Sequence, residues 1–201
     1  MWPARREEAQ DWIAQRLAQF EFDGQAGDIP WRKPGQHQRP AAVLVPLVWH
    51  EDGPTVLLTR RTESLSTHAG QVSFPGGKVD EQDDSTTAAA LREAQEEIGL
   101  APERVSVLGS LPQYVTISNF VVTPVVGIVQ LPLQLKPEPG EVAEVFEVPL
   151  ALALDGRRYQ KHDYVRDGVR GQYLSMTWQG HTIWGATAAM LCLLSRALLQ
   201  D

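Results

Sequence analysis

Hydrophobic residues recur along this chain with two different spacings, which predict a mixture of helices and strands. Near the start, Ile13, Leu17 and Phe20 are four and three positions apart among charged and amide residues. This spacing is typical of an amphipathic helix and predicts one over residues 5–20. Such a helix could serve as a lid, as a dimer element or as a packing element.

After this helix the helical spacing disappears. Residues 23–40 are rich in Gly, Pro and polar side chains and show no period, which predicts a connecting loop. We therefore divide the chain into an N-terminal helix and loop, residues 1–40, and a compact domain, residues 41–201.

Within the compact domain, apolar runs bounded by turn signals predict strands. The expected strands are residues 41–49, 55–59, 105–111, 120–129, 145–148, 172–178 and 181–184, with hairpins formed by the first and last pairs. Helical spacing predicts one helix over residues 85–98 and another from Gly185 to about Leu199. Strands around a central helix, followed by a second long helix, indicate an α/β fold whose mixed sheet has helices on both faces.

The composition is that of a globular domain and narrows the range of partners. Of 201 residues, 43% are hydrophobic and 21% are charged, which disfavours the disordered, collagen-like and coiled-coil classes. With 18 Lys and Arg against 25 Asp and Glu, the net charge is −7. Because an acidic surface repels nucleic-acid phosphates and anionic lipids, we expect neither nucleic acid nor a membrane as partner.

The cysteine content and the apolar segments predict a cytoplasmic protein. The single cysteine, Cys192, lies in an apolar run, where we expect a buried thiol that packs as a small hydrophobe. The first residues contain no apolar stretch of the signal-peptide type. The longest apolar region, residues 120–135, is interrupted by Pro124 and Pro132, which argues against a membrane span.

Candidate chemistry gathers on the helix predicted over residues 85–98. At about 100° per residue, Glu93, Glu96 and Glu97 fall within about 100° of one another on the helix. Gly99 is placed as the C-terminal cap, so these acids stand near the negative end of the helix dipole and repel each other. A divalent cation with oxygen ligands would turn this unfavourable arrangement into coordination.

A solvated acidic face is the alternative interpretation, because most charge runs on helices have no other role. Two neighbouring features favour a metal site instead. Asp80, Asp83 and Asp84 add acid just upstream, and the glycines at 76 and 77 allow a backbone carbonyl to approach a ligand. An EF-hand is excluded, because the sixth position counted from Asp80 is not Gly.

Residues 77–100 resemble the Nudix box. Residues 92–100 (REAQEEIGL) match every fixed position of its second half. In the first half, Asp83 stands where the family has Glu, and eight residues instead of seven separate it from Arg92. The resemblance implies a Nudix α/β/α sandwich that hydrolyses a nucleoside diphosphate linked to another moiety, with Mg²⁺ or Mn²⁺ as cofactor.

Two segments upstream resemble the longer signature of the coenzyme A pyrophosphatase branch of this family. They are residues 57–61 (LLTRR) and 68–77 (HAGQVSFPGG), with weaker echoes at residues 141–150 and 183–188. Ser66 stands where that signature usually carries a basic residue. The resemblance implies that coenzyme A, or a derivative, is cleaved to adenosine 3′,5′-bisphosphate and 4′-phosphopantetheine.

The resemblance also implies which residues bind the metal. Glu93 and Glu97 would be the main ligands, Glu96 an additional ligand, and the Gly77 carbonyl a further one. Carboxylate and carbonyl oxygens are the donors that Mg²⁺ prefers in proteins.

A glutamate outside the box acts as the base in many Nudix enzymes. Glu141 is the candidate here, since it follows a Pro-Gly pair in a predicted loop, and Glu144 is the reserve. The alternative is that both are exposed loop acids, because the fold alone does not assign a base.

Basic residues near the glycines are candidates for binding the substrate phosphates. Arg60 and Arg61 end a predicted strand and His68 lies near a predicted turn, although only one of two adjacent strand residues can point toward the site. Trp178 and Trp184 could stack on an adenine, but in apolar strands we expect them to pack in the core.

We expect coenzyme A, a small-molecule nucleotide, as the substrate. The nearest alternative is another Nudix activity, on ADP-ribose, a dinucleotide such as NADH or a nucleoside triphosphate. A binding module without hydrolysis is a second alternative, which the complete Arg-Glu-x-x-Glu-Glu core disfavours. The sequence leaves open a homodimer, the number of metal ions and the preference among acyl derivatives.

Overall fold

Two long neighbouring strands form the centre of the main sheet. The computed structural model describes residues 2–22, 26–27, 38–65, 67–166 and 168–199. Strand β2 (Arg39–His50) pairs in parallel with β8 (Phe120–Val129) over ten residue pairs and antiparallel with β3 (Gly53–Arg61). The predicted mixed sheet and its first hairpin are therefore confirmed.

Shorter strands extend this sheet on both sides. In the described residues its order is β1-β7-β8-β2-β3-β4, with β5 paired to β2, β6 to β8 and β9 to β3. These strands are β1 (Ala26–Gly27), β4 (Val72–Ser73), β5 (Gly76–Lys78), β6 (Val105–Ser110), β7 (Tyr114–Val115) and β9 (Val142–Pro149). The glycine segment thus lies beside the N-terminal half of β2.

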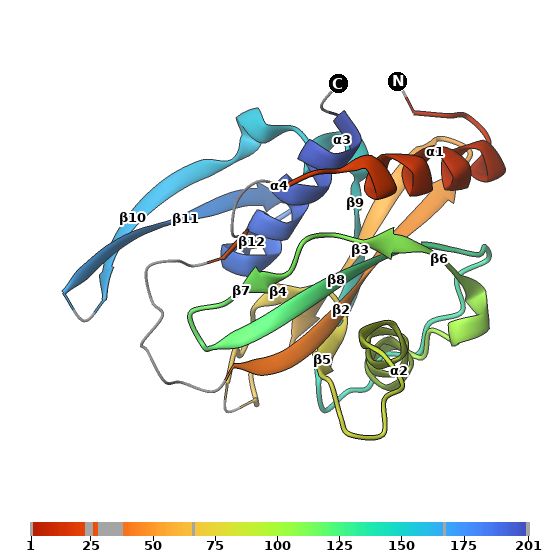
Figure 1. Cartoon of the computed structure of the whole chain (residues 1–201). Coiled ribbons are helices and arrows are strands. Elements are labelled where there is room, and N and C mark those ends of the chain that lie inside the picture. Colours follow the sequence, from red (N-terminus) through yellow and green to blue (C-terminus); the bar gives the residue numbers. More distant parts are fainter. Residues whose placement is uncertain (1, 23–25, 28–37, 66, 167, 200–201) are drawn as a thin grey trace.

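Helices cover both faces of the sheet, as predicted (Figure 1). Helix α2 (Thr86–Ile98) packs its alanines and Ile98 on one face, against apolar residues of β2, β3 and β8. Helices α1 (Arg6–Gln19) and α4 (Gly185–Leu199) lie on the other face and share a second core. No helix in the described part of the chain is long and apolar enough to cross a membrane.

A separate three-stranded sheet projects beside α4 (Figure 1). It contains β10 (Gln160–Arg166), β11 (Val169–Trp178) and β12 (His181–Trp184), all antiparallel. The predicted hairpin of β11 and β12 is confirmed, with left-handed Gln179 and Gly180 in its turn, whereas β10 was not predicted. The expected core position of Trp184 is wrong: Ile183 points into the core, so the adjacent Trp184 points outward and is 39% exposed.

The N-terminal segment differs in detail from the sequence prediction. Helix α1 buries Ala9, Ile13 and Leu17 in the core shared with α4. Within the predicted loop, Ala26–Gly27 pairs with β7, and β2 begins at Arg39, two residues before the expected strand. The division of the chain at residue 40 stays a prediction.

Three short helical segments complete the described elements. They are α3 (Leu150–Ala153) and the 3₁₀ turns η1 (Pro102–Arg104) and η2 (Gly156–Arg158). On α4, burial raises the pKa of the partly buried Cys192 thiol to about 11, in agreement with an unreactive cysteine.

A β-bulge interrupts the pairing of β3 with β9. Arg60 is opposite Glu144, but the next residue, Arg61, is opposite Val142, so Ala143 is an extra residue. As a consequence Val142 packs in the core beneath α2, whereas Glu144 contacts Arg60. The bulged residue lies two positions after Glu141, the predicted base.

Candidate active site

The caps of α2 fix where its glutamates stand. The Ser85 side chain accepts a hydrogen bond from the Ala88 amide at 3.1 Å and starts the helix. Gly99 adopts the left-handed conformation (φ 69°), and its amide donates to the Gln95 carbonyl at 2.9 Å. The helix therefore ends at Ile98, and the predicted C-terminal cap is confirmed.

Glu97 is a buried carboxylate held by two other elements. It is 3% exposed. Arg61 at the end of β3 donates to its Oε1 at 3.3 Å, and the Gly76 amide of β5 donates to its Oε2 at 3.1 Å. Burial raises the pKa of Glu97 to about 7, although both of these contacts act in the opposite direction. A metal ion would favour the ionised form of such a group.

Glu93 lies one turn earlier, against the glycine segment. A Cβ added to Gly77 would lie 2.5 Å from the Glu93 carboxylate, so a larger residue at this position would force that carboxylate to move. Burial raises the pKa of Glu93, and the charges of Glu96 and Glu141 raise it further, whereas Arg92 lowers it. Glu96 is mostly exposed and pairs with Arg92 at 3.1 Å.

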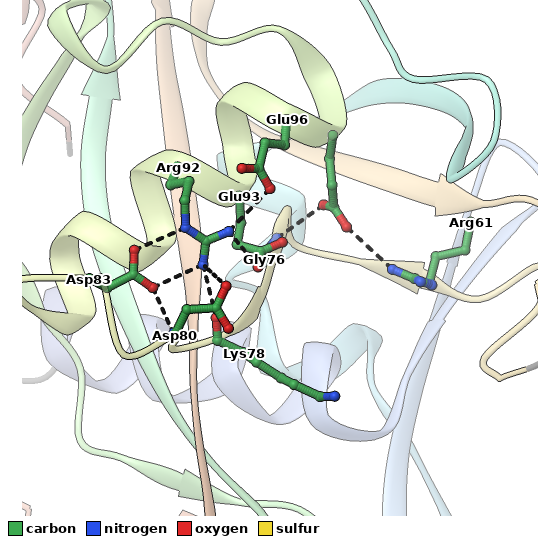
Figure 2. Close-up of polar contacts among 9 residues, drawn as sticks. Arg61, Gly76, Lys78, Asp80, Asp83, Arg92, Glu93 and Glu96 are labelled. Atoms are coloured by element: carbon green, nitrogen blue, oxygen red, sulfur yellow. Dashed lines mark hydrogen bonds and ion pairs between the residues drawn. The ribbon is translucent and has the colours of Figure 1, made fainter.

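Arg92 forms ion pairs with several acidic residues beside Glu93 (Figure 2). Its guanidinium donates to both oxygens of Asp83 at 2.9 Å and to the Lys78 carbonyl at 3.1 Å, and it also pairs with Glu93 at 3.0 Å. This bidentate contact lowers the pKa of Asp83 to about 2. Asp83, which departs from the family pattern, thus anchors Arg92.

The structure separates the two candidate bases. Glu141 is exposed, and its charge raises the pKa of both Glu93 and Glu97. Glu144 lies on the opposite face of the sheet, where it pairs with Arg60 at 3.3 Å and His181 at 3.5 Å. The charge of Glu141 therefore acts on the glutamates of α2, whereas Glu144 is paired on the other face.

The same separation applies to the predicted phosphate-binding residues. Arg61 contacts Glu97, whereas Arg60 contacts Glu144 on the other face, as the alternation of a strand requires. His68 is exposed and lies 2.9 Å from the Gln71 side chain, in a left-handed conformation. Ser66 lies outside the described residues.

The carboxylate oxygens of this site suit a hard divalent cation, although guanidinium groups contact these carboxylates in the structure. Among the described residues, no three His, Cys, Asp or Glu side chains are grouped as in a formed metal site. Instead Arg92 pairs with Glu93 and Glu96, and Arg61 pairs with Glu97. Clustered carboxylates, one of them buried with a raised pKa, are nevertheless the ligands that Mg²⁺ and Mn²⁺ take.

Comparison with known proteins identifies the fold and the family. Residues 38–167 match the family model of the NUDIX domain, which covers more than half of the chain. The chain belongs to the Nudix hydrolase family. The predicted enzyme class, a hydrolase of nucleoside diphosphate derivatives, and the Nudix fold are thereby confirmed.

Several bacterial Nudix hydrolases are similar to this one along most of the chain. The uncharacterized Nudix hydrolase NudL of Pectobacterium atrosepticum is 47% identical over 162 residues, which cover 81% of this chain and 84% of the relative. NudL of Cronobacter sakazakii is 48% identical over 155 residues, 77% and 80% of the two chains. The crystal structure of the Nudix hydrolase RenU from M. smegmatis shares the fold, with a TM-score of 0.51, 24% identity and coverage of 67% and 84%.

Two contacts at the site of this Nudix hydrolase were not predicted from the sequence. The Gly76 amide binds Glu97, whereas the glycine pair had suggested only a carbonyl ligand. Asp80 lies 3.6 Å from Arg92 and belongs to its acidic surroundings. A backbone donor leaves no pattern in one sequence. Asp80 was part of the acid predicted upstream of the helix, but its pairing with Arg92 was not predicted.

Proposed function

We propose that this Nudix hydrolase is a pyrophosphohydrolase of coenzyme A and its derivatives that depends on Mg²⁺ or Mn²⁺. Its products would be adenosine 3′,5′-bisphosphate and 4′-phosphopantetheine. One observation carries the proposal: Glu97 of the Nudix box bonds both to Arg61 and to Gly76. These two residues come from the two segments that resemble the coenzyme A signature, so both segments converge on one carboxylate.

The metal would be held by Glu93, Glu97 and Glu96, with the Gly77 carbonyl as a further ligand. Gly77 supports this assignment because its missing side chain lets Glu93 approach the backbone of β5. When bound, the cation would neutralise the pyrophosphate and lower the pKa of the attacking water.

Arg61 is suited to hold a phosphate oxygen of the substrate. Its side chain is 23% exposed, so a substrate phosphate would pair with the exposed part while Nη1 remains on Glu97. Arg60 and His68 stay weaker candidates, since Arg60 already pairs with Glu144 on the other face.

Glu141 is the proposed base, with the role of removing the proton of the attacking water. Its exposure leaves it accessible, and its charge acts on both Glu93 and Glu97. The hydroxyl of the water goes to the attacked phosphorus, and the bridging oxygen leaves with the other phosphate. Water is thus the only co-reactant.

The base assignment is tested by Glu141→Gln, which keeps the volume and removes the charge. We expect kcat to fall by about 10²–10⁴-fold, with the affinity for Mn²⁺ almost unchanged. The acidic limb of the kcat/KM profile should flatten, because it reports the essential base of the free enzyme. A loss below about fivefold with a normal acidic limb would exclude Glu141.

The substrate is tested with a panel of coenzyme A, dephospho-coenzyme A, ADP-ribose, NADH and nucleoside triphosphates, followed by product chromatography. We expect kcat/KM for coenzyme A to exceed that for ADP-ribose or NADH by at least about tenfold. Equal efficiency on ADP-ribose would favour the alternative, another Nudix activity. Tight binding without turnover in saturating Mg²⁺ would favour a binding module.

A cytoplasmic location and a homodimer remain predictions that accompany this function. Cell fractionation tests the first, and sedimentation of the purified enzyme tests the second.

A further inference from the structure

Thr62 follows Arg61 directly and is a buried polar residue with no role in the site described so far. It is 9% exposed. Its hydroxyl donates to the Gly140 carbonyl at 3.1 Å, and its amide donates to the Glu141 carbonyl at 3.0 Å. Two polar groups of one residue therefore hold the backbone at the proposed base.

The single proton of the Thr62 hydroxyl fixes the direction of these bonds. Thr62 Oγ1 also lies 3.1 Å from Ser64 Oγ. The Gly140 carbonyl can only accept, so Thr62 gives its proton to Gly140 and Ser64 is the donor of the other bond. The hydroxyl is thus used both as donor and as acceptor, which fixes its orientation.

The same loop is attached to the glutamate helix from the other side. The Glu138 amide donates to the Glu97 carbonyl at 2.8 Å. The Glu138 carbonyl then accepts from the amides of Glu141 and Val142 at 3.0 and 2.8 Å. Hydrogen bonds therefore connect the backbone around Glu141 to the end of α2 on one side and to Thr62, the residue after β3, on the other.

We propose that Thr62 is a positioning residue for hydrolysis, which holds Glu141 at the glutamate helix. This inference rests on the proposed function, in which Glu141 is the base. Glu141 lies on an exposed loop, where its side chain needs a fixed backbone to reach one attacking water. A displacement of about 1 Å at a catalytic group can cost about 100-fold in rate.

The test compares Thr62→Val, which replaces the hydroxyl by a methyl group, with Thr62→Ser, which keeps it. We expect Thr62→Val to lower kcat about tenfold, with KM and the affinity for Mn²⁺ within about twofold of wild type. Thr62→Ser should restore most of kcat. If Thr62→Val does not fold, Thr62→Ala carries the same comparison.

Thr187→Val is the matched control. Thr187 is also a buried threonine, 6% exposed, and its hydroxyl donates to the Val72 carbonyl at 3.1 Å, on the face of α4. This variant should lose stability in the same way as Thr62→Val and keep the wild-type kcat. An equal loss of kcat in both variants would reduce Thr62 to a general stabilising residue and overturn the proposal.

A double variant separates this inference from the proposed base. If Thr62 acts through Glu141, then Thr62→Val should cause no further loss of kcat in a Glu141→Gln background. A full additional loss there, or a wild-type kcat in Thr62→Val alone, would overturn the inference and leave the base intact. A wild-type rate in Glu141→Gln would instead remove the base itself.

Discussion

At the scale of single residues, Glu97 is unfavourable for stability and suited to a metal site. Its pKa rises from an ordinary 4.5 to about 7 because the carboxylate is buried. The folded protein therefore binds this proton more tightly than the unfolded chain does. Through this group, the metal-free protein loses stability as the pH rises from about 4.5 to about 7.

We expect Glu97→Gln to lower kcat in Mg²⁺ by roughly two orders of magnitude and to leave the fold intact. At pH 8 without metal, its free energy of unfolding should equal or exceed that of wild type, because no buried charge remains. The difference should shrink at pH 5, where wild-type Glu97 is protonated in the folded state. Urea unfolding at both pH values measures the stability difference, and steady-state kinetics measures kcat. A kcat of Glu97→Gln equal to that of wild type would end the metal assignment.

Asp83 has the opposite dependence on pH. Arg92 lowers its pKa from 3.8 to about 2, so its ionised form stabilises the folded protein. That contribution is fully present above about pH 4 and is lost as the pH falls through about 2. In Asp83→Asn, urea midpoints should fall at pH 5, and the gap to wild type should narrow toward pH 2. A constant gap would mean that the bidentate ion pair does not contribute.

The individual residues of the site were predicted unequally well. The helical spacing of Glu93, Glu96 and Glu97 was enough to place them on one face, because helical periodicity is local. The alternation of a strand required Arg60 and Arg61 to diverge, but only the partners Glu144 and Glu97 show which one reaches the glutamates. A single sequence contains no such long-range pairing.

At the scale of elements, the C-terminal cap of α2 connects the glutamate helix to the following loop. Gly99 has φ 69°, and a Cβ there would lie 3.0 Å from the Lys136 backbone nitrogen and Cβ. The Lys136 amide also donates to the Ile98 carbonyl at 2.8 Å. The cap therefore supports both the helix end and the segment leading to Glu141.

We expect Gly99→Ala to lower the free energy of unfolding by about 1–2 kcal/mol, because alanine is strained in the left-handed conformation. Gly156→Ala is the matched control, since its added Cβ would meet nothing within 4 Å. Urea unfolding of both variants measures the difference. Equal stabilities would contradict the capping role of Gly99.

Elements with a strong local pattern were predicted almost to the residue. The run of residues 120–129 matches β8, and the final helix matches α4. Strand β10 (QKHDYVR) was missed because most of its residues are polar or charged and most are exposed, so no apolar face marks it. Strands β1, β4, β5 and β7 have two or three residues each, too few for any period.

At the scale of the whole molecule, α1 and α4 share one core on the face opposite α2. Ile13 is fully buried there, together with Leu17 and residues of α4. The N-terminal helix is thus a packing element among the three roles that the sequence left open. The packing of this helix should therefore contribute to the free energy of global unfolding.

Ile13→Ala should lower the free energy of unfolding by about 2–5 kcal/mol, because it leaves a cavity between helix and sheet. The exposed neighbour Gln15 provides the control, and Gln15→Ala should change stability by about 0.5 kcal/mol or less. Thermal and urea unfolding report both. Equal effects would mean that α1 does not share the core in solution.

The bulge at Ala143 sets the phase of side-chain alternation along β9. Before it, the strand presents Val142 to the core beneath α2; after it, Glu144 points to the opposite face. Ala143 takes no part in the pairing, so its deletion would make Val142 and Glu144 adjacent, and ordinary alternation would keep each on its present face. Deletion of Ala143 should therefore leave the fold and the partners of β9 in place, which urea unfolding measures, and loss of folding would contradict this register. If Ala143 were instead paired, Val142 and Glu144 would share one face, so the bulge is what lets two residues of the same parity serve opposite faces of the sheet.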